Sequence, residues 1–159
     1  MKTEQKNIGT EKALQKVRQF CGYQERTHQE VKDKLYGYGL YRKDVELLLT
    51  QMIEENYLNE ERYAIAFAGG KFRIKKWGRV KIKYELKQKR VSEYCIREAL
   101  STIEEEDYRK TIRGLFHQKK QSLSREKNVF VKKQKIRSFL LQRGFEPALI
   151  MELIQQWPD

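Results

Sequence analysis

The residues with the clearest chemical potential are lysines and arginines that alternate with apolar residues in the second half of the chain. Residues 71–90 contain ten Lys or Arg and one acid, Glu85, and residues 109–143 contain twelve Lys or Arg and one acid, Glu126. Since the formal net charge is +12, this clustering favours a polyanionic partner or an acidic protein groove over general solubility. The candidate binding residues are Lys71, Arg73, Lys75, Lys76, Arg79, Lys81, Lys83, Lys132, Lys133, Lys135 and Arg137.

If these cations lie along one rim of the molecule, they form a positive stripe that can follow a phosphate backbone, with binding that weakens steeply as salt rises. The alternative is a solvated basic surface with no partner. The aromatic residues among the cations, Trp77 above all, are expected to serve the core rather than to stack on bases.

The sequence offers no catalytic or metal-binding constellation. His28 and His117 lack a nearby Cys, Asp or second His at ligand spacing. The acidic run 104–107 lacks the alternating oxygen ligands and the glycine of a calcium loop. Residues 69–71 (Gly-Gly-Lys) lack the upstream Gly and the following Ser or Thr of a phosphate-binding loop. We therefore predict no enzyme, no cofactor and no metal.

Composition favours a helical protein of 159 residues. Charged residues make up 35% and apolar residues 39%, with only two prolines, and no apolar run approaches the length of a membrane span. Cys21 and Cys95 fit neither a metal site nor a disulfide scaffold, so inert thiols in a reducing compartment are expected. We expect a cytoplasmic protein.

A segment of ten residues is written three times along the chain. Residues 31–40, 82–91 and 136–145 each have an aliphatic residue, a Leu four positions later, and a Gly or Arg four positions after that. Such a repeat predicts tandem units that bury their apolar faces on one another. We predict an all-α fold of about nine helices: a flexible lead-in at 1–10, then three-helix repeats at 11–58, 59–103 and 104–159.

Local signals place the helix starts. Thr27 and Glu30 form a capping box, and Asn59 and Ser92 are N-cap residues. Pro147 suits a first helical turn. The segment 79–86 alternates polar and apolar residues as a strand does, but its repeat copies predict a helix, because a lone strand has no pairing partner.

Two further stretches interrupt this regular pattern. Gly69-Gly70 predicts a bend within a helix, since each glycine costs about 1 kcal/mol there relative to alanine. Residues 118–127 lack an apolar period and are the most loop-like interior stretch.

The chain resembles a known family, the RecX regulatory proteins. The segment 26–39 (RTHQEVKDKLYGYG) is similar to the family pattern Arg-x-Ser-x-x-Glu-Leu-x-x-Lys-Leu, and 56–64 (NYLNEERYA) is similar to Gly-Tyr-Leu-Asn-Asp-x-Arg-Phe/Tyr-Ala. Trp77-Gly78 and the Ile82/Leu86 pair continue the likeness, which covers about residues 12–156. Asn56 and Arg90 replace two usual glycines, and both substitutions are tolerable in a turn if the backbone there avoids a strained left-handed state.

The resemblance implies an elongated, curved array of three three-helix modules. It also implies binding to RecA recombinase and its filament on single-stranded DNA, along the helical groove. There the protein would inhibit or tune ATPase activity, strand exchange, coprotease activity and the SOS response. We expect a monomer that does not enter membranes.

A second hypothesis is a direct DNA-binding regulator, because short trihelical modules also build helix-turn-helix readers. A major-groove reader needs Arg, Asn or Gln at the start of the helix after the turn. The helix after the turn starts with Arg42-Lys43-Asp44 in the first repeat and with Ser92-Glu93 in the second. The second start is poorly suited to a phosphate wall, which favours the recombinase hypothesis.

Overall fold

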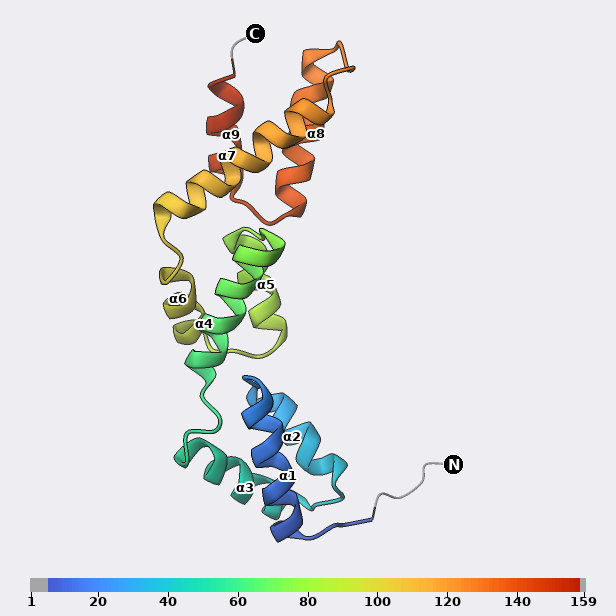
Figure 1. Cartoon of the computed structure of the whole chain (residues 1–159), viewed down its shortest axis with the longest axis vertical. Coiled ribbons are helices and arrows are strands. Elements are labelled where there is room, and N and C mark those ends of the chain that lie inside the picture. Colours follow the sequence, from blue (N-terminus) through green and yellow to red (C-terminus); the bar gives the residue numbers. More distant parts are fainter. Residues whose placement is uncertain (1–5, 158–159) are drawn as a thin grey trace.

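The computed structural model describes residues 6–157, which form nine α-helices, one π-helical turn and no strand. The helices stack as three trios along an elongated rod, with α1 to α3 at one end and α7 to α9 at the other (Figure 1). The helices are α1 (Thr10–Tyr23), α2 (His28–Gly37), α3 (Arg42–Glu54), α4 (Glu60–Gly70), α5 (Arg79–Gln88), α6 (Glu93–Ser101), α7 (Glu105–Ser122), α8 (Val129–Gln142) and α9 (Pro147–Gln155), with the π-helical turn η1 (Lys71–Lys75) after α4. The all-α prediction is confirmed, and the exact repeat boundaries stay a prediction.

The helices begin where their capping residues stand. The Thr27 hydroxyl accepts the Glu30 N–H at 3.0 Å, and the Glu30 carboxylate accepts the Thr27 N–H in return. Asn59 and Ser92 cap α4 and α6 through their side chains. Pro147 opens α9, where its missing N–H costs nothing. These positions follow the sequence signals, because a cap depends on only four consecutive residues.

Residues 79–86 are helical, as the repeat predicted. Ile82 and Leu86 are fully buried on one face of α5, whereas the alternating partners Val80 and Tyr84 are half exposed or more. The alternation of polar and apolar residues in this segment therefore does not produce a strand. Only every second apolar residue, Ile82 and Leu86, is buried.

The Gly69-Gly70 pair ends α4, and helical backbone continues through it into η1, which packs Phe72 into the core and is followed by Lys76 in the left-handed region (φ 56°). The bend expected at this pair stays a prediction, whereas the loop expected at 118–127 is wrong for its first half. The segment 118–127 is helical as far as Ser122, because α7 continues past its last buried residue, Phe116, along the side of α8.

The condition set for Asn56 and Arg90 is not met, since both residues adopt left-handed backbone with φ 62°. Arg90 occupies the repeat position that Gly39 (φ 84°) and Gly144 (φ 92°) occupy in the other trios. The same turn therefore follows the second helix of every trio, and its geometry is kept even where a residue with a β-carbon makes it cost about 1–2 kcal/mol.

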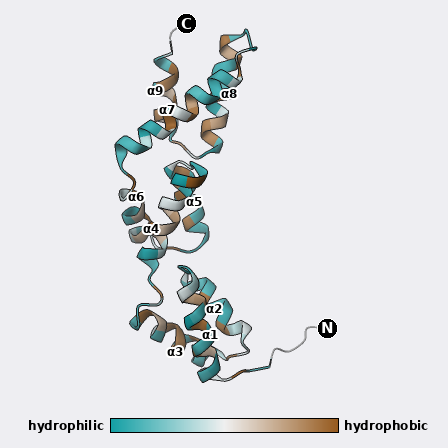
Figure 2. Ribbon diagram, in the orientation of Figure 1, coloured by the Kyte–Doolittle hydropathy of each residue, from teal (hydrophilic) through white to brown (hydrophobic). Residues whose placement is uncertain are grey.

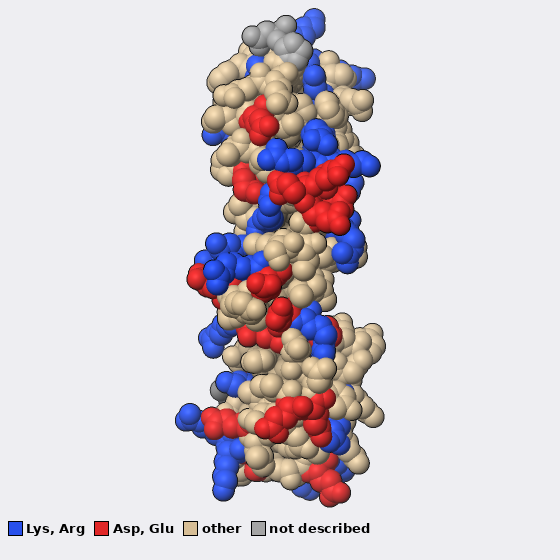
Figure 3. Space-filling view, turned by 90° about the vertical axis from the view of Figure 1, so that its left-hand side faces the viewer, with Lys and Arg blue, Asp and Glu red and all other residues tan. Residues whose placement is uncertain are grey.

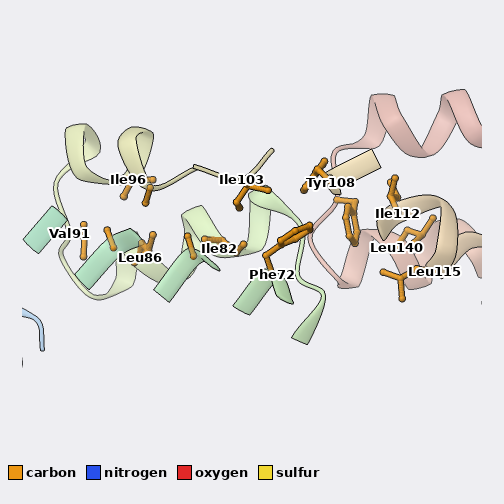
Figure 4. Close-up of a cluster of buried hydrophobic side chains, with 14 of the residues drawn as sticks. Phe72, Ile82, Leu86, Val91, Ile96, Ile103, Tyr108, Ile112, Leu115 and Leu140 are labelled. Atoms are coloured by element: carbon orange, nitrogen blue, oxygen red, sulfur yellow. The ribbon is translucent and has the colours of Figure 1, made fainter. Parts of the chain in front are cut away.

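The buried apolar residues form two separate cores. The first trio has its own, which includes Val17, Leu35 and Met52. The second and third trios share a single continuous core that runs from Val91 through Phe72 and Tyr108 to Leu140 (Figure 4). Apolar and hydrophilic stretches alternate along the helices (Figure 2), and the apolar residues include those buried in the two cores. The second and third trios therefore act as one packed body.

Candidate polyanion-binding surface

The second and third trios meet where two turns touch through their backbones. The Gly78 N–H donates to the Arg143 carbonyl at 2.7 Å, and the Val80 N–H donates to the Gly144 carbonyl at 2.9 Å. A β-carbon on Gly78 would overlap the Gly144 carbonyl, and one on Gly144 would overlap Lys81. Two glycines are therefore required for this approach.

Arg79 lies inside this junction. Its guanidinium stacks on the Tyr108 ring with Cζ 3.8 Å from the centroid, and it forms ion pairs with Glu105 (3.0 Å) and Glu146 (3.1 Å). The Arg79 N–H donates to the Tyr108 hydroxyl at 3.0 Å, and that hydroxyl donates to Glu146. This candidate binding residue has its charge balanced within the molecule, and its contacts join the two trios.

The junction network also shifts the titration of its members. Burial first, and the hydrogen bond to Glu146 second, raise the pKa of Tyr108, so the phenol is neutral. Hydrogen bonds from Arg79 and then Arg109 lower the pKa of Glu105. The network is therefore stable in the form that pairs one neutral phenol with charged carboxylates and guanidinium groups.

A continuous run of cations and aromatic rings passes over this junction. In the second trio, Lys71 Nζ lies 5.0 Å and Lys81 Nζ 4.5 Å from the Trp77 ring centroid. Lys71 and Lys89 also approach the Phe67 ring, at 5.5 and 5.7 Å. Trp77 itself is half-buried against the shared core, as its expected role required.

The run continues into the third trio through Arg143. The Arg143 Nη1 donates to the Lys75 carbonyl at 2.9 Å, and its guanidinium lies 5.1 Å from the Phe139 ring centroid. Lys119 Nζ approaches the same ring at 5.2 Å. Lys119, Lys135 and Phe139 then line a shallow hollow of about 390 Å³ between α7 and α8.

We call this surface the cationic strip and define it by the residues that make these ring contacts, together with Lys135, which lines the hollow and forms an ion pair with Glu126 at 3.7 Å. They are Phe67, Lys71, Trp77, Lys81, Lys89, Lys119, Lys135, Phe139 and Arg143. Lysine stems that lie along aromatic rings keep their charged ends in water, and each such contact contributes about 0.5–1 kcal/mol at exposed sites. The rings therefore hold the cations in place, which lowers the entropy cost of binding an anion.

Several predicted residues lie elsewhere. Arg73 borders a hollow that Glu104 and Asp107 also line. Residues two apart on a helix point about 200° apart, so Lys83 lies on the flank of α5 opposite Lys81. The same spacing separates Lys133, which lies 5.7 Å from the Trp157 ring centroid, from Lys135 on α8.

The remaining predicted binding residues lie on α8 and around η1. Helical spacing places Lys132 on the side of α8 that carries Lys135, and Arg137 on the side that carries Lys133. Lys75 and Lys76 are exposed in and after η1, beside the strip. The eleven predicted residues thus do not share one rim: Lys71, Lys81 and Lys135 join the strip itself, while sequence reasoning missed Lys89, Lys119 and Arg143. The basic blocks contain all three, but only the fold shows that they meet.

Charge is distributed unevenly around the rod. On the face where α6 and the start of α7 lie, acidic side chains gather in bands with cations between them (Figure 3). At the start of α7, the exposed acids are Glu104, Glu105, Glu106 and Asp107. An anionic ligand would therefore be guided away from this face and toward the strip.

Catalytic and metal-binding chemistry has no visible site in the part of the chain that the structure describes. Residues 6–157 contain no group of three His, Cys, Asp or Glu side chains that could hold a metal ion. Cys21 and Cys95 are both buried and unpaired, and burial raises the pKa of the Cys21 thiol. Within the same residues no helix combines the length and apolarity that crossing a membrane requires.

These features define a class of protein: a tandem array of three-helix units with a strongly basic surface on its second and third units. Models of the RecX second and third three-helix domains match residues 59–100 and 105–154. The chain belongs to the RecX family.

Relatives and solved structures agree with this assignment. The regulatory protein RecX of Clostridium perfringens strain 13 is 34% identical over 76% of this chain, and that of Thermotoga petrophila is 28% identical over 95%. The matches cover 57% of the first relative and 88% of the second, so the chain spans little more than half the length of some relatives. The crystal structure of RecX from Lactobacillus salivarius superposes with a TM-score of 0.84 at 22% identity, over 92% of this chain and 95% of that one, which shows a shared fold.

Proposed function

We propose that this chain regulates a RecA recombinase by binding the protein and its filament on single-stranded DNA. The relatives carry the name regulatory protein RecX, and the cationic strip supplies a surface for a polyanionic assembly. In this proposal the rod docks along the filament groove and restrains ATPase activity, strand exchange and coprotease activity, and with them the SOS response.

The observation that carries the proposal is the continuity of the strip across the junction. The backbone contacts of Gly78 and Gly144 hold its two halves together, so the charges form one extended surface. An elongated ligand with regularly spaced negative charge, such as a nucleoprotein filament, can contact all of it at once. Binding should weaken steeply with salt, because counterions are released from the anion.

Direct reading of DNA sequence by the three-helix units is less favoured. The helix that follows the left-handed turn of the second trio, α6, begins with Glu93, and the corresponding α9 is preceded by Glu146, which pairs with Arg79. Carboxylates at these helix starts would repel phosphates. A major-groove reader needs donors there instead.

The test is recombinase ATPase activity on single-stranded DNA, measured with increasing amounts of this chain. We expect inhibition at near-stoichiometric protein, and weaker inhibition by a variant with Lys81→Glu and Lys119→Glu. A matched variant with Lys12→Glu and Lys43→Glu changes the net charge equally, on exposed lysines of the first trio. If the wild-type protein in excess leaves both ATPase activity and filament occupancy unchanged, the proposal fails.

A further inference from the structure

A second surface lies on the opposite flank of α5, in the groove between α5 and α6. It encloses about 170 Å³ and is lined by Lys83, Lys87, Glu93, Ile96, Arg97 and Leu100. Lys83 and Lys87 are four residues apart on α5, and Glu93, Arg97 and Leu100 follow at helical spacing on α6, so each helix contributes one rim. We call this feature the α5–α6 groove.

The groove combines an apolar floor with a cationic rim. Ile96 is buried and Leu100 is half-buried, and both belong to or pack against the shared core. Three cations and one acid surround them. Lys87 Nζ is 3.8 Å from the Glu93 carboxylate, a long and exposed pair, and Lys83 and Arg97 form no ion pair with any residue in the range 6–157.

The size of the groove limits its occupant. Sites for small organic ligands usually enclose about 300–1,000 Å³, so a volume of about 170 Å³ fits one or two side chains of a bound polypeptide. An apolar side chain would cover Leu100, and neighbouring carboxylates would meet Lys83 and Arg97 through charge-assisted hydrogen bonds. This is the pattern of an amphipathic segment laid into a groove.

The adjoining surface of α5 extends the apolar contact. Val80 and Tyr84 are four residues apart and are 50% and 60% exposed. They lie on the solvent side of the helix, between the groove and Lys81, so a segment bound in the groove could also pack on them. The groove floor itself is aliphatic and lacks the aromatic platform that single-stranded nucleic acid prefers.

We propose that the α5–α6 groove binds an acidic amphipathic segment of the recombinase, while the cationic strip on the other flank of α5 faces the nucleic acid. This assignment rests on the proposed function and adds to it a division of labour between the two flanks of one helix. It predicts that protein binding and DNA binding can be weakened separately.

The experiment compares three variants of the full chain. A groove variant carries Lys83→Glu and Arg97→Glu, a strip variant carries Lys81→Glu and Lys119→Glu, and the control carries Lys12→Glu and Lys43→Glu, so that all three have the same net charge. Each is titrated against a labelled single-stranded oligonucleotide, and against recombinase filaments formed on that oligonucleotide. Circular dichroism and thermal melting show that each variant is folded.

We expect the groove variant to lose about tenfold or more in affinity for the filament relative to the control, since it exchanges attraction for repulsion at two positions on the rim of the groove. The affinity of the groove variant for the free oligonucleotide should stay within about twofold of that of the control. The affinity of the strip variant for the same oligonucleotide should fall by more than about twofold. Equal losses of filament and oligonucleotide affinity by the groove variant would identify the groove as a nucleic-acid site and overturn the assignment. Filament affinity equal to that of the control would overturn it as well.

A second measurement does not depend on affinity. A photoreactive benzoylphenylalanine at position 97 should crosslink to the recombinase polypeptide, and the same residue at position 119 should crosslink to DNA. Crosslinking of position 97 to DNA, or to neither component of a bound filament, would overturn the groove assignment alone. If the wild-type chain does not bind the filament, the proposed function fails and the groove assignment fails with it.

Discussion

The two junctions between the trios of this rod are built in opposite ways. Between the second and third trios, two glycine turns share backbone hydrogen bonds, Tyr108 connects Arg79 to Glu146, and one apolar core crosses the boundary. Between the first and second trios, the contacts are polar. Arg62 pairs with Glu25 and donates to the Asn56 carbonyl at 3.1 Å, while Arg90 donates to Gln29 at 3.3 Å.

This difference shows which parts of the molecule move together. Exposed or partly exposed polar contacts contribute little to stability, whereas a shared core must be broken to separate the trios it joins. All residues of the cationic strip belong to the body with the shared core, so its charges keep a fixed spacing. The first trio has its own core and is joined to that body by contacts that water can replace.

The largest effect on stability should come from a substitution that blocks the backbone contact between Gly78 and Gly144. Gly78→Val places side-chain atoms where the Gly144 carbonyl lies and removes the two backbone hydrogen bonds, at a combined cost of about 3–5 kcal/mol in unfolding free energy. Chemical denaturation would measure it. Gly114→Ala is the matched control: a β-carbon there meets nothing within 4 Å in the middle of α7, so stability should rise by about 0.5–1 kcal/mol. Equal effects of the two changes would contradict the proposed tight junction.

A smaller loss is expected from Tyr108→Phe. The ring packing stays, but the Arg79 N–H loses its acceptor and Glu146 loses a donor, at a cost of about 1–3 kcal/mol. The variant should melt at a lower temperature, and amide protons of Gly78 to Val80 should exchange faster with solvent. Unchanged exchange there would mean that the hydroxyl does not hold the junction. Tyr84→Phe, on the exposed side of α5, is the control.

The junction between the first and second trios should respond in geometry rather than in stability. Arg62→Ala removes the pair with Glu25 and the contacts to the 56–57 backbone, at about 1 kcal/mol or less. In the Arg62 variant, the distribution of distances between dyes on the first and second trios, measured by fluorescence energy transfer, should become broader. Arg42→Ala, which breaks a pair within α3, should leave the distance distribution narrow. A narrow distribution in the Arg62 variant would argue for a rigid rod throughout.

The smallest expected effect is an increase in stability. Arg90→Gly relieves a left-handed residue that has a β-carbon and should stabilise the protein by about 0.5–1 kcal/mol, although it also removes the hydrogen bond to Gln29. Thermal melting measures the gain. Since Gly39 occupies the same turn at φ 84°, Gly39→Ala should be destabilising in the same assay. Loss of stability in the Arg90 variant would mean that the Gln29 contact is worth more than the backbone strain.

The parts of the fold that the sequence predicted are those encoded locally or by repetition. The caps at Thr27, Asn59 and Ser92 depend on a few neighbouring residues, and the helical state of 79–86 followed from its aligned copies. Repetition also carried a signal for the turn at Arg90, because the equivalent positions are glycines that adopt the left-handed region.

The candidate site was predicted less well, for a physical reason. Whether a cation is available depends on partners far away in sequence: Glu146 neutralises Arg79 from 67 positions away, and Arg143 reaches the Lys75 carbonyl across 68. Charge density along the chain located the basic region but not its faces. Spacing of two residues within α5 and α8 was enough to divide the predicted group between opposite flanks.

The contact between Gly78 and Gly144 has a consequence for how this surface can change over time. Because main chain touches main chain there, the closest approach of the two trios does not depend on the lysines and arginines that carry the positive charges. Individual lysines can therefore be exchanged, gained or lost during evolution while the spacing between the basic surfaces of the second and third trios stays constant.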